Sequence, residues 1–241
     1  MRVLLAGALG VIGRPLTELL KRHGHEVVGT TRSPARCSQI QALGIAPAVM
    51  NALDSESVRA AFAAARPEAL IHQLTDLPKT FDPHEVDAAR ERNSRLRIVG
   101  TDNLMAAAQS YGVRRVVAQS IAFVYAPGKA PYDESAPLYE NAPGSTRVAV
   151  QGILALERAV TRTPGVEGIV LRYGRLYGPG TWFERPPESP VVHPHAAAHA
   201  ALLALTRGAP GTYNIAEDDG SVSIARAREQ LGFDPAFRLD G

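Results

Sequence analysis

Cysteine and lysine are scarce in this sequence of 241 residues. A single cysteine, Cys37, excludes an internal disulfide and a cysteine-based zinc cluster. Positive charge comes almost entirely from arginine, and 26 Lys+Arg against 24 Asp+Glu leave a net charge of +2. That balance leaves no excess of positive charge that would indicate nucleic-acid binding. No run reaches the ~18 apolar residues of a membrane-spanning helix. We therefore expect a cytoplasmic protein that binds neither nucleic acid nor a membrane.

Two histidines suggest a metal site only by their spacing. His195 and His199 lie four residues apart in a predicted helix, which places both on one face. No cysteine or carboxylate completes a ligand set nearby in the sequence. We predict no bound metal.

Short apolar runs alternate with longer helical patterns along the chain. Predicted strands cover 3–5, 26–28, 46–50, 69–72, 115–118, 166–171 and 212–215. Predicted helices cover 14–22, 34–43, 55–65, 87–111, 146–161, 196–207 and 224–231, and segments 126–144 and 174–194 predict loops. This alternation predicts a parallel sheet with helices on both faces, the Rossmann-type doubly wound α/β fold.

Three glycines, Gly7, Gly10 and Gly13, separate the first predicted strand from the first helix. Glycine in this pattern allows a tight turn, a close approach of backbone to a pyrophosphate, and close packing of helix on strand. The helix N-terminus adds free N–H groups and the positive end of its dipole. We predict a dinucleotide phosphate loop formed by Gly7, Leu9, Gly10, Val11, Ile12 and Gly13.

The chain resembles the short-chain dehydrogenase/reductase superfamily, in its extended, NAD-dependent epimerase/dehydratase-like branch. The likeness is carried, in order, by 6–13, 70–73, 99–104, 116–120 and 171–180. It implies a single NAD(P)-binding Rossmann domain over 1–241. Members of this branch have a larger C-terminal substrate domain. Here we expect a small, abbreviated C-terminal cap, with segments at about 174–210 and 216–241, and a small substrate.

The end of the second predicted strand indicates which dinucleotide is bound. An NAD enzyme of this type places a carboxylate there to hold the ribose 2′-OH. This chain instead has Thr31, Arg32, Ser33 and Arg36, whose hydroxyls and guanidinium groups suit a 2′-phosphate. The other interpretation is two surface arginines near a helix start. We favour NADP(H) over NAD(H).

The resemblance implies further cofactor contacts on neighbouring strands. Asn51, Ala52 and Leu53 fall where the family brackets the adenine ring. The nicotinamide-ribose side is predicted to be lined by Gln73 and Leu74, and Ser120 and Tyr173 are further predicted cofactor contacts.

The family's catalytic Tyr-x-x-x-Lys pair is missing. Its lysine lowers the pKa of the tyrosine, so that the phenol exchanges a proton with a carbonyl or alcohol. Glu157 matches the family's Glu four residues beyond the Lys, which puts Ile153 in the Lys position and Ala149 in the Tyr position. Ser120 stands in the position of the family Ser that holds the substrate oxygen.

Two interpretations of this loss stay open. Another residue could transfer the proton, and the candidates besides Ser120 are Tyr132, Tyr139, Tyr177 and His193. The chain would then be an oxidoreductase or isomerase for a small carbonyl, alcohol or sugar-like substrate. Alternatively, it is a non-catalytic NADP(H)-sensing regulator that binds a protein partner.

A homodimer is the expected assembly, because relatives of this fold pair through the two helices that correspond to 87–111 and 146–161. Helix 146–161 is apolar on more than one face, whereas a helix that only covers a sheet needs one apolar stripe. Small residues at 106–108 would allow close approach. The alternative is a helix buried more deeply within one chain.

Overall fold

The computed structural model describes residues 1–78 and 83–239, and of the side chains of residues 83 and 84 nothing is said. Seven strands form one sheet in the order β3-β2-β1-β4-β5-β6-β9. All six neighbouring pairs are parallel. The strands are β1 (Arg2–Ala6), β2 (Glu26–Thr31), β3 (Ala46–Val49), β4 (Ala69–His72), β5 (Arg115–Ile121), β6 (Glu167–Tyr173) and β9 (Gly211–Ile215). The predicted Rossmann-type α/β fold is confirmed.

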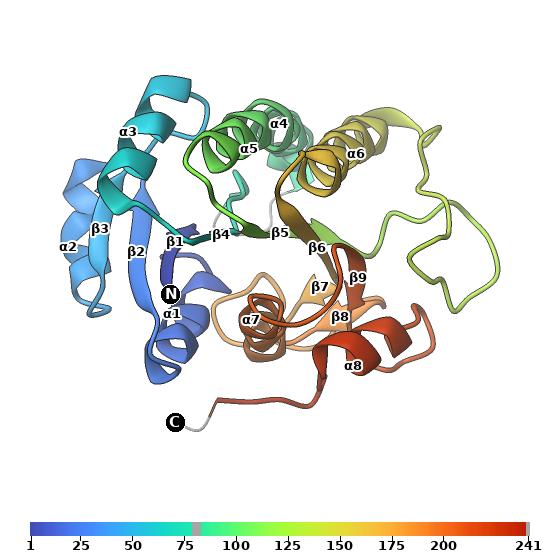
Figure 1. Cartoon of the computed structure of the whole chain (residues 1–241). Coiled ribbons are helices and arrows are strands. Elements are labelled where there is room, and N and C mark those ends of the chain that lie inside the picture. Colours follow the sequence, from blue (N-terminus) through green and yellow to red (C-terminus); the bar gives the residue numbers. More distant parts are fainter. Residues whose placement is uncertain (79–82, 240–241) are drawn as a thin grey trace.

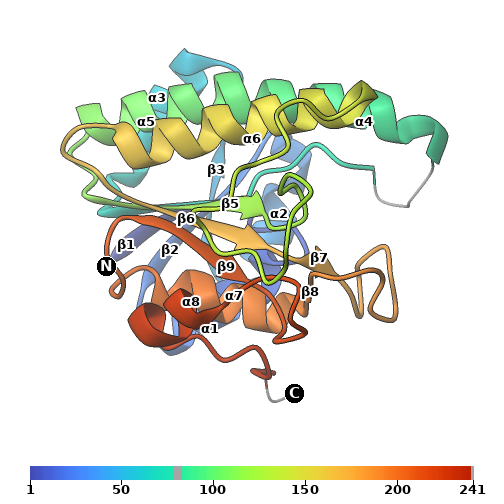
Figure 2. The ribbon, with the colours of Figure 1, turned by 90° about the vertical axis from the view of Figure 1, so that its right-hand side faces the viewer.

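Helices cover both faces of the sheet (Figure 1). One face carries α1 (Gly13–Arg22), α2 (Cys37–Gln41), α7 (Pro194–Leu203) and α8 (Ala225–Leu231). The other carries α3 (Ser55–Ala65), α4 (Pro83–Arg95), α5 (Thr101–Ser110) and α6 (Gly144–Arg162). Figure 2 shows the two helical layers with the sheet between them. None of the helices within 1–78 and 83–239 is long and apolar enough to cross a membrane.

Apolar side chains alternate along the strands, and this alternation builds two cores. In β1, Val3 and Leu5 pack under α1 and α7, whereas Leu4 and Ala6 pack under α3 and α5. Because all six pairs of neighbouring strands are parallel, the carboxyl ends of the strands lie at one edge of the sheet. Ligands of open α/β sheets bind at that edge.

Local signals set several element boundaries. Helix α3 spans the predicted residues because Asp54 caps it, accepting hydrogen bonds from the N–H groups of Glu56 (2.9 Å) and Ser57 (3.3 Å). The predicted helix 34–43 is instead a 3₁₀ turn, η1 (Pro34–Arg36), followed by α2.

The predicted helix 87–111 is interrupted. The π-helical turn η2 (Leu96–Gly100) separates α4 from α5. Such turns are rare, and they occur often at functional sites.

The predicted cap segments contain elements of the central layers. Helix α7 packs against α1, and β9, which follows segment 174–210, pairs with β6. The short strands β7 (Arg175–Leu176) and β8 (Val191–Val192) form a separate two-stranded sheet. The division of the chain into a domain and a cap stays a prediction.

Candidate functional site

The glycine loop is fixed by close backbone contacts. Gly7 has φ +101°, and a Cβ there would lie 2.8 Å from the carbonyl oxygen of Gln73. A Cβ on Gly13 would lie 2.1 Å from the oxygen of Gly7. Gly10 differs, because its Cβ would meet only that same oxygen, at 3.2 Å. Gly7 and Gly13 thus shape the loop, and Gly10 leaves its outer side open to a ligand.

Two helix N-termini converge beside this loop. Helix α1 begins at Gly13, and in the described chain no side chain caps it. The N–H groups of Arg14 and Leu16 donate to the carbonyls of Gly10 and Ile12. Helix α7 begins at Pro194. Both adjoin a cavity of about 380 Å³, lined by Leu9, Gly10, Val11, Arg14, Pro15, Pro179, Gly180, His193, Pro194 and His195. Helix dipoles and Arg14 favour an anion there, which fits the pyrophosphate of a dinucleotide.

Gln73 is a second residue beside the glycine loop that is suited to bind a dinucleotide. Its Nε2 donates to the hydroxyl of Tyr173 at 3.1 Å, but its Oε1 is buried and has no hydrogen-bond partner among the residues described. Burial raises the pKa of the Tyr173 phenol, which stays protonated. An unpartnered acceptor next to the glycine loop suits a ribose hydroxyl, because buried polar groups are normally paired.

The predicted 2′-phosphate residues follow β2. Arg32 is exposed, and its Nη1 lies 3.5 Å from Oδ2 of Asp76, which follows β4. Strand β1 lies between β2 and β4, so this ion pair spans the carboxyl end of β1. The Thr31 hydroxyl accepts from the N–H of Ser33 (3.2 Å), and Arg36 Nε donates to Gln39 (3.3 Å).

The predicted adenine segment forms a turn after β3. Asn51 Oδ1 accepts from the N–H of Leu53 at 3.2 Å. Asn103 on α5 donates to the carbonyl of Ala52 at 2.9 Å. These contacts hold the turn against α5.

Ser120 is not brought to the open edge. It is fully buried, and its hydroxyl donates to Oε1 of Glu157 on α6 at 2.7 Å. Gln119, on the opposite face of β5, donates to the carbonyl of Leu74 at 3.0 Å. A role for Ser120 in holding substrate stays a prediction, and its hydroxyl already has a partner.

The two positions that the sequence predicts for the family's catalytic pair lie on α6. Ile153 is fully buried in an apolar cluster with Val124, Leu138 and Val150, and Ala149 is half-buried one turn earlier. No ammonium group could lie at Ile153 without losing that packing. The position is therefore built for a hydrocarbon.

The proposed substitute proton donors do not gather in one place. Tyr132 stacks on Tyr125 with ring centroids 5.2 Å apart, and its hydroxyl donates to the carbonyl of Gly128. The backbone N–H of Tyr139 donates to Val124. Tyr177 and His193, by contrast, meet edge to face at 5.7 Å.

Tyr177 and His193 are held by the C-terminal segment. Arg238 donates to the Tyr177 hydroxyl at 3.1 Å, and that hydroxyl also donates to Glu217. Burial and the carboxylate of Glu217 raise the pKa of Tyr177. Burial, followed by the charge of Arg238, lowers the pKa of His193 to about 4. At neutral pH this pair is a protonated phenol beside a neutral imidazole.

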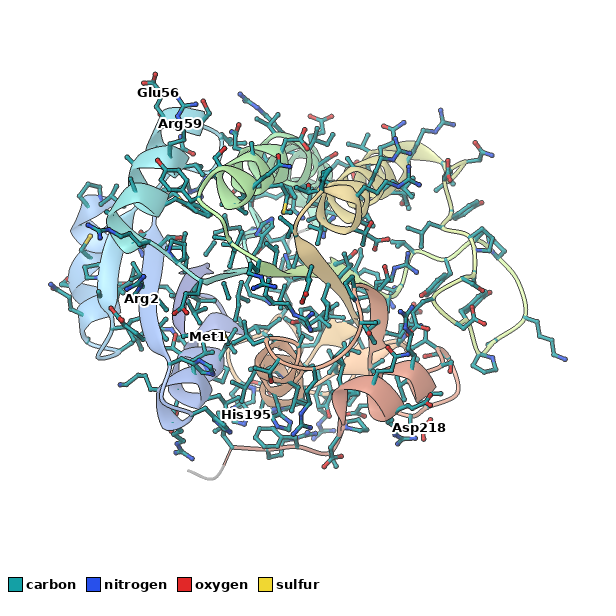
Figure 3. All side chains as sticks on the ribbon, in the orientation of Figure 1. Met1, Arg2, Glu56, Arg59, His195 and Asp218 are labelled. Atoms are coloured by element: carbon teal, nitrogen blue, oxygen red, sulfur yellow. The ribbon has the colours of Figure 1, made fainter. Side chains whose placement is uncertain are left out.

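The same C-terminal segment lies against the start of α7. Figure 3 labels His195 at this place, and the N–H of Leu239 donates to its Nδ1 at 3.1 Å. His199, one turn later, stacks on Phe237 with centroids 3.9 Å apart. The two histidines therefore pack against protein groups.

Sequence reasoning missed two buried polar features near the carboxyl-terminal half of the sheet. The first is Arg97 on η2, which is only 5% exposed. The second is a polar network in which Glu157 pairs with Arg172, Arg172 donates to the Tyr125 hydroxyl, and that hydroxyl donates to Asn214. Ser120 and Arg172 are paired on the neighbouring strands β5 and β6, and two polar residues within apolar strands could have indicated the network. Nothing in the sequence distinguishes Arg97 from its exposed neighbours.

Comparison with known proteins identifies the family. The model of the NAD dependent epimerase/dehydratase family matches residues 3–212. The chain belongs to this family. The predicted resemblance is thereby confirmed. Membership of the epimerase/dehydratase family accounts for the glycine loop at the edge of a Rossmann-type sheet.

Relatives within the epimerase/dehydratase family differ in what their names describe. A 3-diazoavenalumate denitrifying reductase from Streptomyces is 42% identical over 230 residues, which cover 94% of this chain and 71% of that protein. Among solved structures, UDP-glucose 4-epimerase of Thermotoga maritima with UDP-glucose has a TM-score of 0.77 at 18% identity, covering 99% of this chain and 94% of that one. UDP-glucose 4-epimerase of Thermus thermophilus with NAD has a TM-score of 0.73 at 23% identity, covering 98% and 85%. These structural likenesses concern the fold alone.

Proposed function

We propose that this chain is an NADPH-dependent reductase that replaces a diazo group of a small anionic substrate with hydrogen. The single observation that carries the proposal is Ile153, a buried hydrocarbon where the family has its catalytic lysine. Carbonyl and alcohol chemistry needs a proton donor for the developing oxyanion. A diazonium carbon or nitrogen that receives hydride develops no oxyanion, so the loss of the pair is tolerated.

The reductase relative supports this choice of chemistry. Its name describes a denitrifying reductase of a diazo compound, and it is 42% identical over 94% of this chain. When bound, NADPH supplies a hydride, and the overall exchange of a diazonium group for hydrogen releases N₂. The chain itself binds the two ligands, orients them and excludes water. Ala149, half-buried where the family has its tyrosine, leaves room for the substrate ring.

The preference for NADPH rests on the end of β2. Arg32 and Arg36 are exposed there, with the hydroxyls of Thr31 and Ser33 beside them. Guanidinium groups bind a phosphate by two parallel hydrogen bonds. The ion pair with Asp76 is long and its Arg32 side chain is exposed, so a 2′-phosphate can compete with Asp76 for Arg32.

A homodimer is proposed as the assembly. Ile98 and Val99 on η2 are each 38% exposed, next to α6. On α6 itself, Val150, Ile153, Leu156 and Val160 are buried, and Leu154 is half-buried. A pairing through α4, α5 and α6 would cover Ile98 and Val99.

The proposed reaction is tested with 4-carboxybenzenediazonium as substrate. The protein and NADPH should convert it to benzoate and N₂, with one NADPH consumed for each N₂ released. The matched control is 4-carboxybenzaldehyde, which presents a carbonyl at the same place and should not be reduced. Reduction of the aldehyde without denitrification would favour a carbonyl reductase. Binding of NADPH with turnover of neither compound would favour the non-catalytic, NADP(H)-sensing regulator.

A further inference from the structure

Arg97 is a buried cation that lacks a partner within the described residues. Its side chain retains 5% exposure, and its Nε is buried with no hydrogen-bond acceptor. No carboxylate of 1–78 or 83–239 forms an ion pair with it. Burial lowers its pKa to about 10, which leaves it charged at neutral pH. An unpaired buried charge is strongly destabilising, so its retention needs a reason.

Other buried arginines of this chain are fully engaged. Arg172 forms two hydrogen bonds with Glu157. Arg115 donates to Glu167 and to three backbone carbonyls. Arg97 departs from this pattern, since the fold satisfies arginines elsewhere but leaves this one open.

Neighbouring ionisable groups do not neutralise Arg97. Glu157 raises its pKa through the electrostatic field, but the oxygens of Glu157 are bound by Ser120 and Arg172. Burial, followed by the charge of Arg97, lowers the pKa of His72 to about 4, so His72 is neutral. His72 in turn contacts Thr101 at 3.2 Å. Within residues 1–78 and 83–239, no anion therefore pairs with Arg97.

The position of Arg97 links it to the missing catalytic pair. Ser94, at the end of α4, donates to the carbonyl of Val148 on α6 at 2.9 Å. A Cβ on Gly152 would lie 2.7 Å from the Ser94 hydroxyl. These contacts place the end of α4 beside the turns of α6 that carry Val148 and Gly152, and Figure 2 shows the two helices side by side. Arg97 lies three residues after Ser94, on η2, which also contacts α6. The π-helical turn changes the helix register at this point.

We propose that Arg97 binds an anionic oxygen, a carboxylate, of the substrate beside the part of α6 that carries Ala149 and Ile153. The inference deepens the proposed function and rests on it, because it names the substrate class of the same site. In this chain the cation of the site comes from η2 and not from α6. Arg97 can hold a carboxylate by two parallel hydrogen bonds, whereas a lysine is a single point of charge.

The test measures benzoate binding by calorimetry and thermal unfolding in the wild type, in Arg97→Met and in Arg158→Met. Arg158 is exposed on α6 and provides a matched arginine-to-methionine control. Benzoate should bind the wild type and Arg158→Met equally, and should bind Arg97→Met at least about tenfold more weakly. Benzamide, which has the same shape without the charge, should bind none of them measurably.

Stability without ligand separates binding from a structural role. Removing an unpaired buried charge should raise the melting temperature of ligand-free Arg97→Met by about 2 °C or more. A melting temperature that falls, together with unchanged benzoate binding, would overturn the proposal. So would the absence of benzoate binding to the wild type.

Two further measurements test the role of Arg97 without relying on the stability of the methionine variant. In the wild type, benzoate should shift the NMR resonance of the Arg97 Nε–H group. The resonance is identified by its absence in Arg97→Lys, so the measurement does not depend on the folding of the methionine variant. A resonance that does not move contradicts the proposal. NADPH titration of the same proteins should be unchanged by Arg97→Met. Failure of the wild type to bind NADPH would refute the proposed reductase while leaving the benzoate result to decide Arg97.

Discussion

Arg172 and Glu157 form a bidentate ion pair inside the protein. Nε of Arg172 lies 2.9 Å from Oε1 of Glu157, and Nη2 lies 2.6 Å from Oε2. The pair joins β6 to α6 beneath the carboxyl edge of the sheet. Ser120 donates to the same carboxylate, so three elements meet at one charge. Glu157 thus holds α6 against β5 and β6.

Glu157→Gln should destabilise the protein by about 3–5 kcal/mol, because it leaves Arg172 buried and unpaired. Urea denaturation followed by circular dichroism measures the free energy of unfolding. The control is the double variant Glu157→Met/Arg172→Met, which removes both charges and should recover much of the loss. A single variant as stable as the wild type would show that the pair contributes little.

Stability should fall as the pH falls from about 6.5 towards 4, because His72 has a folded-state pKa of about 4, caused first by burial. The unfolded chain binds a proton at His72 below about 6.5, and the folded chain does not, so protonation favours unfolding. The contribution of His72 is present above pH 6.5 and is lost by about 2–3 kcal/mol on approaching pH 4. His72→Gln should flatten this slope. An unchanged slope would assign it to other groups, such as His193, whose pKa is also lowered.

Cofactor preference should depend on Arg32 and its partner Asp76. Arg32→Ala should weaken NADPH binding by about 1–3 kcal/mol and leave NADH binding unchanged, since only the 2′-phosphate is lost as a partner. Asp76→Asn should strengthen NADPH binding, because it frees Arg32 and removes a negative charge near the phosphate. Isothermal titration with both nucleotides measures these differences. Equal affinity of the wild type for NADPH and NADH would argue against the 2′-phosphate role.

Sedimentation equilibrium at micromolar concentration should find a dimer. Ile98→Glu places a charge on a half-exposed apolar position of η2 and should shift the protein to monomer. Ala149→Glu should instead weaken NADPH binding and leave the dimer intact, because we predict that Ala149 lies at the position of the family tyrosine. A wild type that sediments as a single monomeric species would rule out the dimer.

Local signals made part of this structure predictable. Strand β4 and helix α3 have the predicted limits, the latter because the Asp54 cap lies within the helix's own first turn. The glycine loop was predictable from its own spacing, and the contacts of Gly10 and Gly13 lie within residues 7–13. Such features depend on a few neighbouring residues.

Tertiary contacts decided what the sequence could not indicate. Segment 87–111 has a continuous helical pattern, and the π-helical turn within it arises where α4 and α5 pack on α6. The predicted fifth strand stops at 118, whereas β5 continues to Ile121 and turns Ser120 towards Glu157. Arg97 follows Arg90, Arg92 and Arg95 in the same stretch, and only packing distinguishes the buried one.

Isotope transfer tests the central claim most directly. NADPH carrying deuterium at the transferring position of the nicotinamide is incubated with the protein and 4-carboxybenzenediazonium, and the benzoate formed is analysed by mass spectrometry. If the chain is a reductase that replaces the diazo group with hydrogen, the benzoate carries one deuterium at the former diazo carbon. Benzoate without deuterium, or no benzoate above the rate seen without protein, would contradict that function.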